Sequence, residues 1–216
     1  RVSQYLKSLQ QALLDVQVNA IPQVTKSNGG VMSAELGRTA CAQMILSGTA
    51  AGVIGASYVS KLSGYPNTMS LDVGGTSADV AFIRDGQPQF GIGEVIGEFP
   101  IFIPSVAVTS IGAGGGSIAW VDALGILRVG PESAGSKPGP ACYGNGGECA
   151  TITDAFVVLG YIGQFDLGYS AIEIDVTKAR SAVDVLAEKI GKEIEETAQA
   201  IVDIAVSGMY MEISKL

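Results

Sequence analysis

The stretch that most constrains the fold runs from Met69 to Ile83 and reads MSLDVGGTSADVAFI. Apolar and polar side chains alternate up to Val73, which is the pattern of a β-strand with one buried face. Two glycines follow at once, and a second apolar run begins at Val80. The stretch therefore predicts a β-hairpin whose turn carries glycines, hydroxyls and a carboxylate.

The residues of this turn favour a phosphate-binding site. Gly74 and Gly75 allow a ligand to approach the backbone closely, and successive N–H groups in such a turn can form an anion site. The hydroxyls of Thr76 and Ser77 could donate to phosphate oxygens, and Asp72 could hold a Mg²⁺ ion through water. An ordinary hairpin turn is the alternative, because most glycine-rich turns only reverse the chain. A Rossmann or P-loop site is disfavoured, because a strand rather than a helix follows the glycines.

Composition limits the functions that this chain can have. Its 216 residues suffice for one large domain or two small ones. A net charge of −8 argues against a nucleic-acid surface, and no apolar run is long enough to cross a membrane. The absence of histidine removes histidine bases and metal ligands. We therefore expect a soluble protein without a nucleic-acid or membrane partner.

The cysteines bear on the compartment. Cys41, Cys142 and Cys149 are few and odd in number, which favours free thiols in a reducing, cytoplasmic environment. A metal site at Cys142 and Cys149 is the weaker alternative, because further ligands are missing from the surrounding sequence. The final Ser-Lys-Leu has the form of a peroxisomal address. We expect a domain boundary there instead, so the chain reads as a piece of a longer protein.

The first 62 residues predict helices joined by a short extended segment. Apolar residues at spacings of three and four predict an amphipathic helix over residues 1–20, and residues 18–25 read as an edge strand. A turn is expected at residues 27–30. A helix capped by Ser33 is predicted to run to Leu46, and a small-residue helix from Ala50 to Leu62, with Ser47-Gly48-Thr49 as an interruption. The second helix could direct its N-terminus at an anion or could simply pack tightly in the core.

The chain after the first hairpin alternates strands with glycine-rich segments. Residues 87–102 read as strand fragments joined by loops. The segment Gly112–Gly116 holds four glycines, which cannot form the interior of a strand or helix, so we expect it to line a pocket. A second hairpin is predicted over residues 118–129. It is followed by a long loop, Gly130–Gly147, which we expect to be ordered by Cys142 and Tyr143; a disordered linker is the alternative.

Helices close the chain. Thr153 or Asp154 is expected to cap a short helix over residues 155–161. Residues 179–190 predict an amphipathic helix that Gly191 ends, and Glu193, Glu195 and Glu196 suit the start of the next one. We interpret these last two helices as packing elements.

Five segments together resemble the hydantoinase A/5-oxoprolinase/acetone carboxylase family. They are SNGG (27–30), LSGTAAGVIGA (46–56), LDVGGTSADVAFI (71–83), TSIGAGGGSIAWVDALGILRVGPESAGSKPGPACYG (109–144) and TITDAFVVLG (151–160). The resemblance covers most of the chain, and motifs of this length and order are specific. The chain departs from the family at Thr49 (proline expected), Ala78 (threonine expected) and Lys137 (an acidic residue or alanine expected). None of these changes removes a predicted phosphate contact.

The resemblance implies an α/β fold of the ribonuclease-H-like type, with a mixed sheet and flanking helices, in the actin-like ATPase superfamily. Family members have two such domains that close on ATP. Residues 1–216 would then be essentially the second domain, with 1–64 as a helical lead-in and 65–216 as the part that bears the phosphate hairpin. The partner hairpin would lie upstream and an adenosine-binding segment downstream.

The resemblance also implies the chemistry and the site. ATP, with Mg²⁺, would activate an amide or carbonyl oxygen, and the protein would supply positioning and charge stabilisation. Asp72 would be the Mg²⁺-side catalytic carboxylate and Asp79 would orient water. The cofactor-binding residues would be Gly74, Gly75, Thr76, Ser77, Gly112, Gly114, Gly115 and Gly116. Asp122 and Asp154 are lesser candidates, since each is in a position typical of a turn or cap residue.

Three functions remain open at this point. The first is an ATP-dependent hydrolase of a cyclic amide, such as a hydantoin or 5-oxoproline. The second is a subunit of an ATP-dependent ketone carboxylase, and the third is a nucleotide-binding module without catalysis. The family implies a hydantoinase B-like companion subunit and an oligomer.

Overall fold

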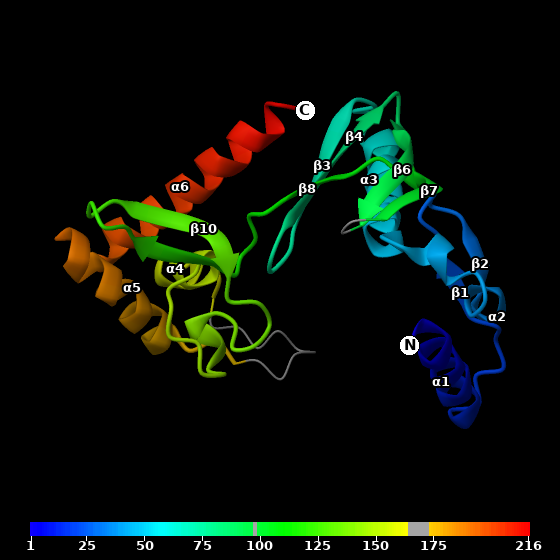
Figure 1. The fold of residues 1–216 in the computed structure, drawn as a ribbon, viewed down its shortest axis with the longest axis horizontal. Helices are drawn as coiled ribbons and strands as arrows, with labels where there is room; N and C mark the ends of the chain where they lie inside the picture. Colours follow the sequence, from blue (N-terminus) through cyan, green and yellow to red (C-terminus); the bar gives the residue numbers. More distant parts are fainter. Residues whose placement is uncertain (97–98, 164–172) are drawn as a thin grey trace. The chain divides into compact units, whose positions relative to one another are not determined.

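The computed structural model describes residues 1–96, 99–163 and 173–216, which contain helices and several small sheets (Figure 1). The chain forms two compact units. The first unit contains Arg1–Asp72 and Asp79–Thr109, and the second contains Val73–Ala78 and Ser110–Leu216. The turn of the first hairpin therefore belongs to the second unit, although its strands belong almost wholly to the first.

The first unit begins with helices and a small sheet. Its elements are α1 (Val2–Asp15), β1 (Gln23–Thr25), β2 (Val31–Ser33), α2 (Ala34–Gly37), the 3₁₀-helix η1 (Cys41–Met44) and α3 (Ser47–Leu62). Strands β1 and β2 pair antiparallel around the predicted turn, in which Gly29 has φ +77°. The helix predicted for residues 1–20 is confirmed as α1, but only Leu6 of its apolar stripe is buried.

The helix predicted over residues 33–46 is wrong beyond its start. Ser33 caps it as expected, with its Oγ accepting from the N–H of Leu36 at 3.2 Å, but α2 ends at Gly37. The chain continues as η1, and Leu46 then takes a left-handed conformation with φ +55°. The segment Ser47–Thr49 forms the first turn of α3 rather than an interruption.

The next strands include the predicted hairpin, β3 (Thr68–Val73) and β4 (Ala78–Arg84). The others are β5 (Gln87–Pro88), β6 (Phe90–Ile96), β7 (Phe99–Val106) and β8 (Thr109–Ile111), whose last two residues belong to the second unit. Strand β4 pairs with β3, β5 and β8, and β6 pairs antiparallel with β7. The strands predicted within residues 87–102 are confirmed where the chain is described; positions 97 and 98 lie outside the described residues.

Helix α3 supports the first hairpin. Its buried positions are Ala50, Val53, Ser57 and Ser60, a stripe of small side chains at helical spacing. Ala50 and Val53 share a core cluster with Ala81 and Ile83 of β4. Small side chains allow the helix to lie close to the strand, which brings the first turn of α3 beside the ends of β3 and β4.

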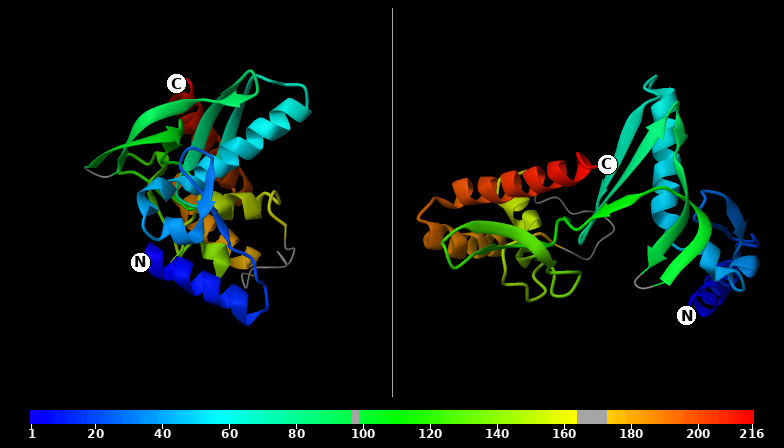
Figure 2. Two further views of the ribbon diagram at one scale, coloured as in Figure 1. Left: turned by 90° about the vertical axis from the view of Figure 1, so that its right-hand side faces the viewer. Right: turned by 45° about the horizontal axis from the view of Figure 1, so that its top comes forward.

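The second unit packs three helices with one hairpin. Its elements are β9 (Ser117–Val121), β10 (Leu127–Ser133), the 3₁₀-helix η2 (Ala141–Tyr143), α4 (Ile152–Val158), α5 (Val176–Ile190) and α6 (Ile194–Ile213). Helix α4 contacts both α5 and α6, as the two views in Figure 2 show. The predicted stop at Gly191 is confirmed, with φ +67°. The predicted second hairpin is also confirmed, as β9 and β10.

Two predictions in this unit need correction. Strand β10 continues to Ser133, so the first four residues of the predicted loop belong to a strand. The Gly130-Pro131 pair lies within β10 and does not end it. The cap of α4 is Thr151 rather than Thr153 or Asp154, and Asp154 completes a capping box with it. The loop is ordered where expected, since Cys142 is fully buried in a cluster with Val157.

Candidate functional site

The turn between β3 and β4 contains both bonded and unbonded backbone N–H groups. The N–H of Gly74 donates to the carbonyl of Ser77 at 2.8 Å. Across the described parts of the chain, the backbone N–H groups of Gly75, Thr76 and Ser77 make no hydrogen bond. Gly74, Gly75 and Thr76 are exposed. Ser77 is partly buried. Consecutive unbonded N–H groups of this kind can bind an anion such as a phosphate.

The glycine-rich segment before β9 holds this turn in place. The N–H of Gly115 donates to the carbonyl of Gly74 at 2.9 Å, and that of Gly116 donates to the carbonyl of Gly75 at 2.7 Å. A Cβ on Gly114 would lie 2.6–2.7 Å from backbone atoms of the turn. The two backbones therefore meet directly, and only glycine fits at Gly114.

The other amide groups of this segment are bound within the protein. The N–H of Gly114 donates to Ser117 Oγ at 3.1 Å, and the carbonyl of Gly116 accepts from the N–H of Ala134 at 2.8 Å. Gly114, Gly115 and Gly116 thus hold the turn Gly74–Ser77 through their backbone. Gly112 is exposed and lines a separate cavity of about 330 Å³ between β10 and α6.

The two predicted catalytic carboxylates lie in one pocket of the first unit. Its volume is about 200 Å³, and its lining is Thr49, Gly52, Val53, Ser70, Leu71, Asp72 and Asp79. Thr49 Oγ1, in the first turn of α3, donates to Asp79 Oδ2 at 3.1 Å. The structure thus brings Asp72, Asp79 and the N-terminus of α3 together.

The donor set of this pocket suits a hard cation. Its charged lining residues are the two aspartates, and no lysine or arginine is among the residues that line it. Carboxylate and hydroxyl oxygens are ligands that Mg²⁺ accepts, and Mg²⁺ keeps several of its waters. The volume lies below the range for whole small-molecule ligands, so the pocket suits a hydrated ion or a phosphate group.

Asp154 has a structural position. It is fully buried, and its Oδ2 accepts from the N–H and the Oγ1 of Thr151 at 2.9 and 2.8 Å. The N–H groups of Ala141 and Cys142 also donate to its carboxylate, at 3.2 and 2.8 Å. Asp154 therefore ties the long loop to the start of α4 and is enclosed by protein donors.

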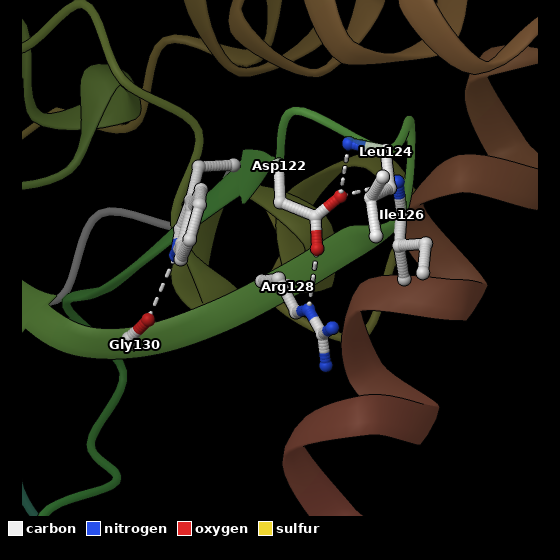
Figure 3. Close-up of polar contacts among 6 residues, drawn as sticks. Asp122, Leu124, Ile126, Arg128 and Gly130 are labelled. Atoms are coloured by element: carbon white, nitrogen blue, oxygen red, sulfur yellow. Dashed lines mark hydrogen bonds and ion pairs between the residues drawn. The ribbon is translucent and has the colours of Figure 1, made fainter.

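Asp122 has a structural position as well, in the turn of the second hairpin (Figure 3). Its carboxylate accepts from the N–H groups of Leu124 and Ile126 at 2.9 and 3.0 Å. Arg128 Nε donates to its other oxygen at 3.0 Å. The hydrogen bond from Ile126, with those from Leu124 and Arg128, lowers the pKa of Asp122 below its usual value. The Asp122 carboxylate therefore stabilises the turn in which Asp122 itself lies.

The cysteines support no metal site in the part of the chain that the structure covers. All three are free, as predicted, and Cys142 is buried. Burial raises the pKa of the Cys142 thiol strongly, and the nearby Asp154 carboxylate raises this pKa further. Among residues 1–96, 99–163 and 173–216, no group of three or more histidine, cysteine, aspartate or glutamate side chains could hold a metal ion.

Two contacts were not predicted from the sequence. Thr153 Oγ1 donates to the carbonyl of Gly115 at 2.9 Å, so Thr153 reaches the glycine-rich segment instead of capping its own helix. Trp120 Nε1 donates to the carbonyl of Gly130 at 2.8 Å across the second hairpin (Figure 3). The TITDA motif at 151–155 was the only sequence signal for the first contact.

The fold of this chain is similar to that of two solved structures, acetone carboxylase and the ATP-dependent caprolactamase of Pseudomonas jessenii. The nucleotide-free structure of acetone carboxylase matches 95% of this chain and 29% of that chain, with a TM-score of 0.80 and 30% identity. The caprolactamase structure matches 98% of this chain and 31% of that one, with a TM-score of 0.75 and 32% identity. These matches confirm the predicted fold class.

The chain belongs to the Hydantoinase/oxoprolinase family, whose model matches residues 1–216. It is 35% identical to the caprolactamase alpha subunit of Pseudomonas jessenii, over 88% of this chain and 28% of that protein. It is 38% identical to the acetophenone carboxylase gamma subunit of Aromatoleum aromaticum, over 88% of this chain and 26% of that protein. The chain thus spans between a quarter and a third of these relatives. In the described residues, no helix combines the length and the apolar character that a membrane crossing requires.

Proposed function

We propose that this chain is the phosphate-binding part of an ATP-dependent hydrolase that opens a cyclic amide such as a hydantoin or 5-oxoproline. The observation that carries the proposal is the turn Gly74–Ser77, with three consecutive N–H groups unbonded among the described residues. The turn begins two residues after Asp72 in the chain. The similarity to caprolactamase supports the substrate class.

The residues would divide the work as follows. The N–H groups of Gly75, Thr76 and Ser77 would bind phosphate oxygens, and the Thr76 hydroxyl would add a donor. Asp72 would hold Mg²⁺ through water, and Asp79 would orient a water molecule. Bound MgATP would supply the phosphoryl group that converts an amide oxygen into a better leaving group. The chain's own contribution is positioning and charge stabilisation.

The carboxylates of this pocket favour a cation as a companion of ATP. Two aspartates and no lysine or arginine line the pocket, so its carboxylates would repel a polyanion. A divalent cation offsets this repulsion and also uses the carboxylate oxygens as ligands. We therefore expect ATP binding to require Mg²⁺ and to be lost on chelation.

The proposal includes the domain type, the compartment and the companion subunit of this chain. Residues 1–216 would form one ribonuclease-H-like ATPase domain, the second of a pair, in a cytoplasmic oligomer with a hydantoinase B-like companion. Support comes from the names of two relatives, an alpha subunit and a gamma subunit of larger enzymes.

The second candidate is a subunit of an ATP-dependent ketone carboxylase. It is favoured by the 38% identity to the acetophenone carboxylase gamma subunit and by the TM-score of 0.80 to acetone carboxylase. The same phosphate turn would serve it, because both reactions activate an oxygen with ATP. A non-catalytic nucleotide-binding module is disfavoured, because Asp72 and the glycines of the turn are all in place.

The test is ATP hydrolysis by the full-length protein with its companion subunit. Stimulation by a hydantoin or 5-oxoproline would support the hydrolase, and stimulation only by a ketone with bicarbonate would support the carboxylase. Each assay is run with Mg²⁺ and with excess EDTA. If neither substrate stimulates hydrolysis and MgATP does not bind, the turn at Gly74 only reverses the chain and the proposal is wrong.

A further inference from the structure

The start of α4 contacts the glycine-rich segment that holds the phosphate turn. The N–H of Thr153 and its Oγ1 both donate to the carbonyl of Gly115, at 2.8 and 2.9 Å. A Cβ on Gly115 would lie 2.7 Å from Thr153 Oγ1, so the side chain sits directly against this residue. The contact links residues 38 positions apart in the sequence.

The same residue of the glycine-rich segment reaches the phosphate turn on its other side. The peptide N–H of Gly115 donates to the carbonyl of Gly74 at 2.9 Å. The neighbouring N–H of Gly116 donates to Gly75 at 2.7 Å. A continuous path of hydrogen bonds therefore runs from Thr153 through Gly115 to Gly74, the first residue of the turn.

The Thr153 hydroxyl is not needed to cap its helix. Thr151 accepts from the N–H of Asp154, and Asp154 accepts from the N–H of Thr151, which completes the capping box. The hydroxyl of Thr153 instead gives Gly115 a second donor. Thr153 is 8% exposed, so water competes little for this bond.

We propose that Thr153 is a positioning residue for the phosphate turn. It fixes the carbonyl of Gly115, so that the N–H groups of Gly115 and Gly116 are aimed at Gly74 and Gly75. The unbonded N–H groups of the turn are then held in one orientation before a ligand arrives, which lowers the entropy lost on binding. This inference rests on the proposed function for its effect on ATP, and its structural part stands on the contacts alone.

The experiment compares Thr153→Val and Thr153→Ser in the full-length protein. Thr153→Val removes the hydroxyl at nearly constant size, while Thr153→Ser retains it. We expect Thr153→Val to weaken MgATP binding about three- to tenfold, the effect of one lost buried hydrogen bond, and Thr153→Ser to restore it. Calorimetry measures the affinity.

Two controls separate positioning from loss of stability. Thr197→Val removes a hydroxyl that donates to the Glu193 carbonyl at the same distance, 2.9 Å, in α6. It should lower the unfolding midpoint and leave MgATP affinity unchanged. Tyr143→Phe removes a hydroxyl from η2 and leaves the hydrogen bond from Thr153 to Gly115 in place, so it should also leave affinity unchanged.

Amide hydrogen exchange gives a readout that does not need ATP. Exchange in peptides that cover residues 110–118 should accelerate in Thr153→Val, relative to the protein with Thr197→Val. If wild-type protein binds MgATP and Thr153→Val binds it equally well, the inference is overturned. If wild-type protein does not bind MgATP, the proposed function fails, and unchanged exchange in Thr153→Val would overturn the inference separately.

Discussion

The two hairpins of this protein have similar turns with opposite chemistry. Each joins two strands through a short segment with glycine, and an aspartate lies in the second turn and two residues before the first. In the β9–β10 turn, Asp122 accepts the N–H groups of Leu124 and Ile126, and Arg128 neutralises it. In the β3–β4 turn, Asp72 precedes the glycines and lines a pocket with Asp79, and three N–H groups make no bond among the described residues.

The difference lies in what holds each turn. The second turn is held from within by its own carboxylate, so its donors are used. The first is held from outside, because Gly115 and Gly116 bind the carbonyl groups of Gly74 and Gly75. External support leaves the donors of the first turn free to bind a ligand, whereas internal support leaves a turn that only connects two strands.

The largest effect is expected from a side chain in the first turn. A Cβ on Gly75 would have no neighbouring atom within 4 Å among the described residues, so Gly75→Val should fold normally. It should reduce ATP turnover by about 100-fold or more, because the side chain blocks backbone approach to phosphate. Turnover and urea unfolding are measured together on the full-length protein.

Gly125→Ala provides the matched change in the second turn. Gly125 has φ +77°, so alanine there should lower the free energy of unfolding by about 1–2 kcal/mol. ATP turnover should stay at the wild-type value. If Gly75→Val and Gly125→Ala lost ATP turnover equally, the proposed difference in function between the two turns would be wrong.

A smaller effect is expected when the carboxylates lose their charge. Asp72→Asn should lower ATP turnover at least about tenfold and raise the Mg²⁺ concentration required, because an amide is a weaker ligand for a hard cation. Asp122→Asn should leave both quantities unchanged. Titration of turnover with Mg²⁺ checks this, and near-normal turnover in Asp72→Asn would remove its metal role.

The smallest effect concerns the internal support of the second turn. Asp122 has a lowered pKa in the folded protein, so its charge stabilises the fold above its pKa in the unfolded chain. This contribution is lost as the pH falls through the folded-state pKa. Asp122→Ala should therefore lower the unfolding midpoint at pH 7, and the gap to wild type should close under acid conditions. A gap that does not change with pH would mean that packing, not charge, supports the turn.

Local patterns predicted the elements that local forces decide. The alternation around Met69–Val73 predicted β3, and glycine at position 191 predicted the end of α5. Ser33 was a correct cap, yet the helix after it ended at Gly37, where a Cβ would press on Leu6, Val24 and Met44. Tertiary crowding at Gly37 cannot be seen in the spacing of apolar residues.

For the candidate site too, some residues are predicted from the sequence and some contacts are seen only in the structure. The sequence predicts that the turn Gly74–Ser77 and both aspartates belong to a site. It gave no means to see that Thr49 would join Asp79, or that Thr153 would bind Gly115. The family resemblance grouped these residues in order along the chain but did not state which atoms meet.

The sequence by itself determined the class of fold and the family, and it predicted a turn at Gly74–Ser77, since these depend on motifs of residues close together in the chain. Only the tertiary structure decided which turn keeps its donors available. That outcome depends on Gly114–Gly116, about 40 residues away, whose missing side chains let one backbone bind another. A hydrogen bond between distant peptide groups has no side-chain signature, so its consequence appears only when the chain is folded.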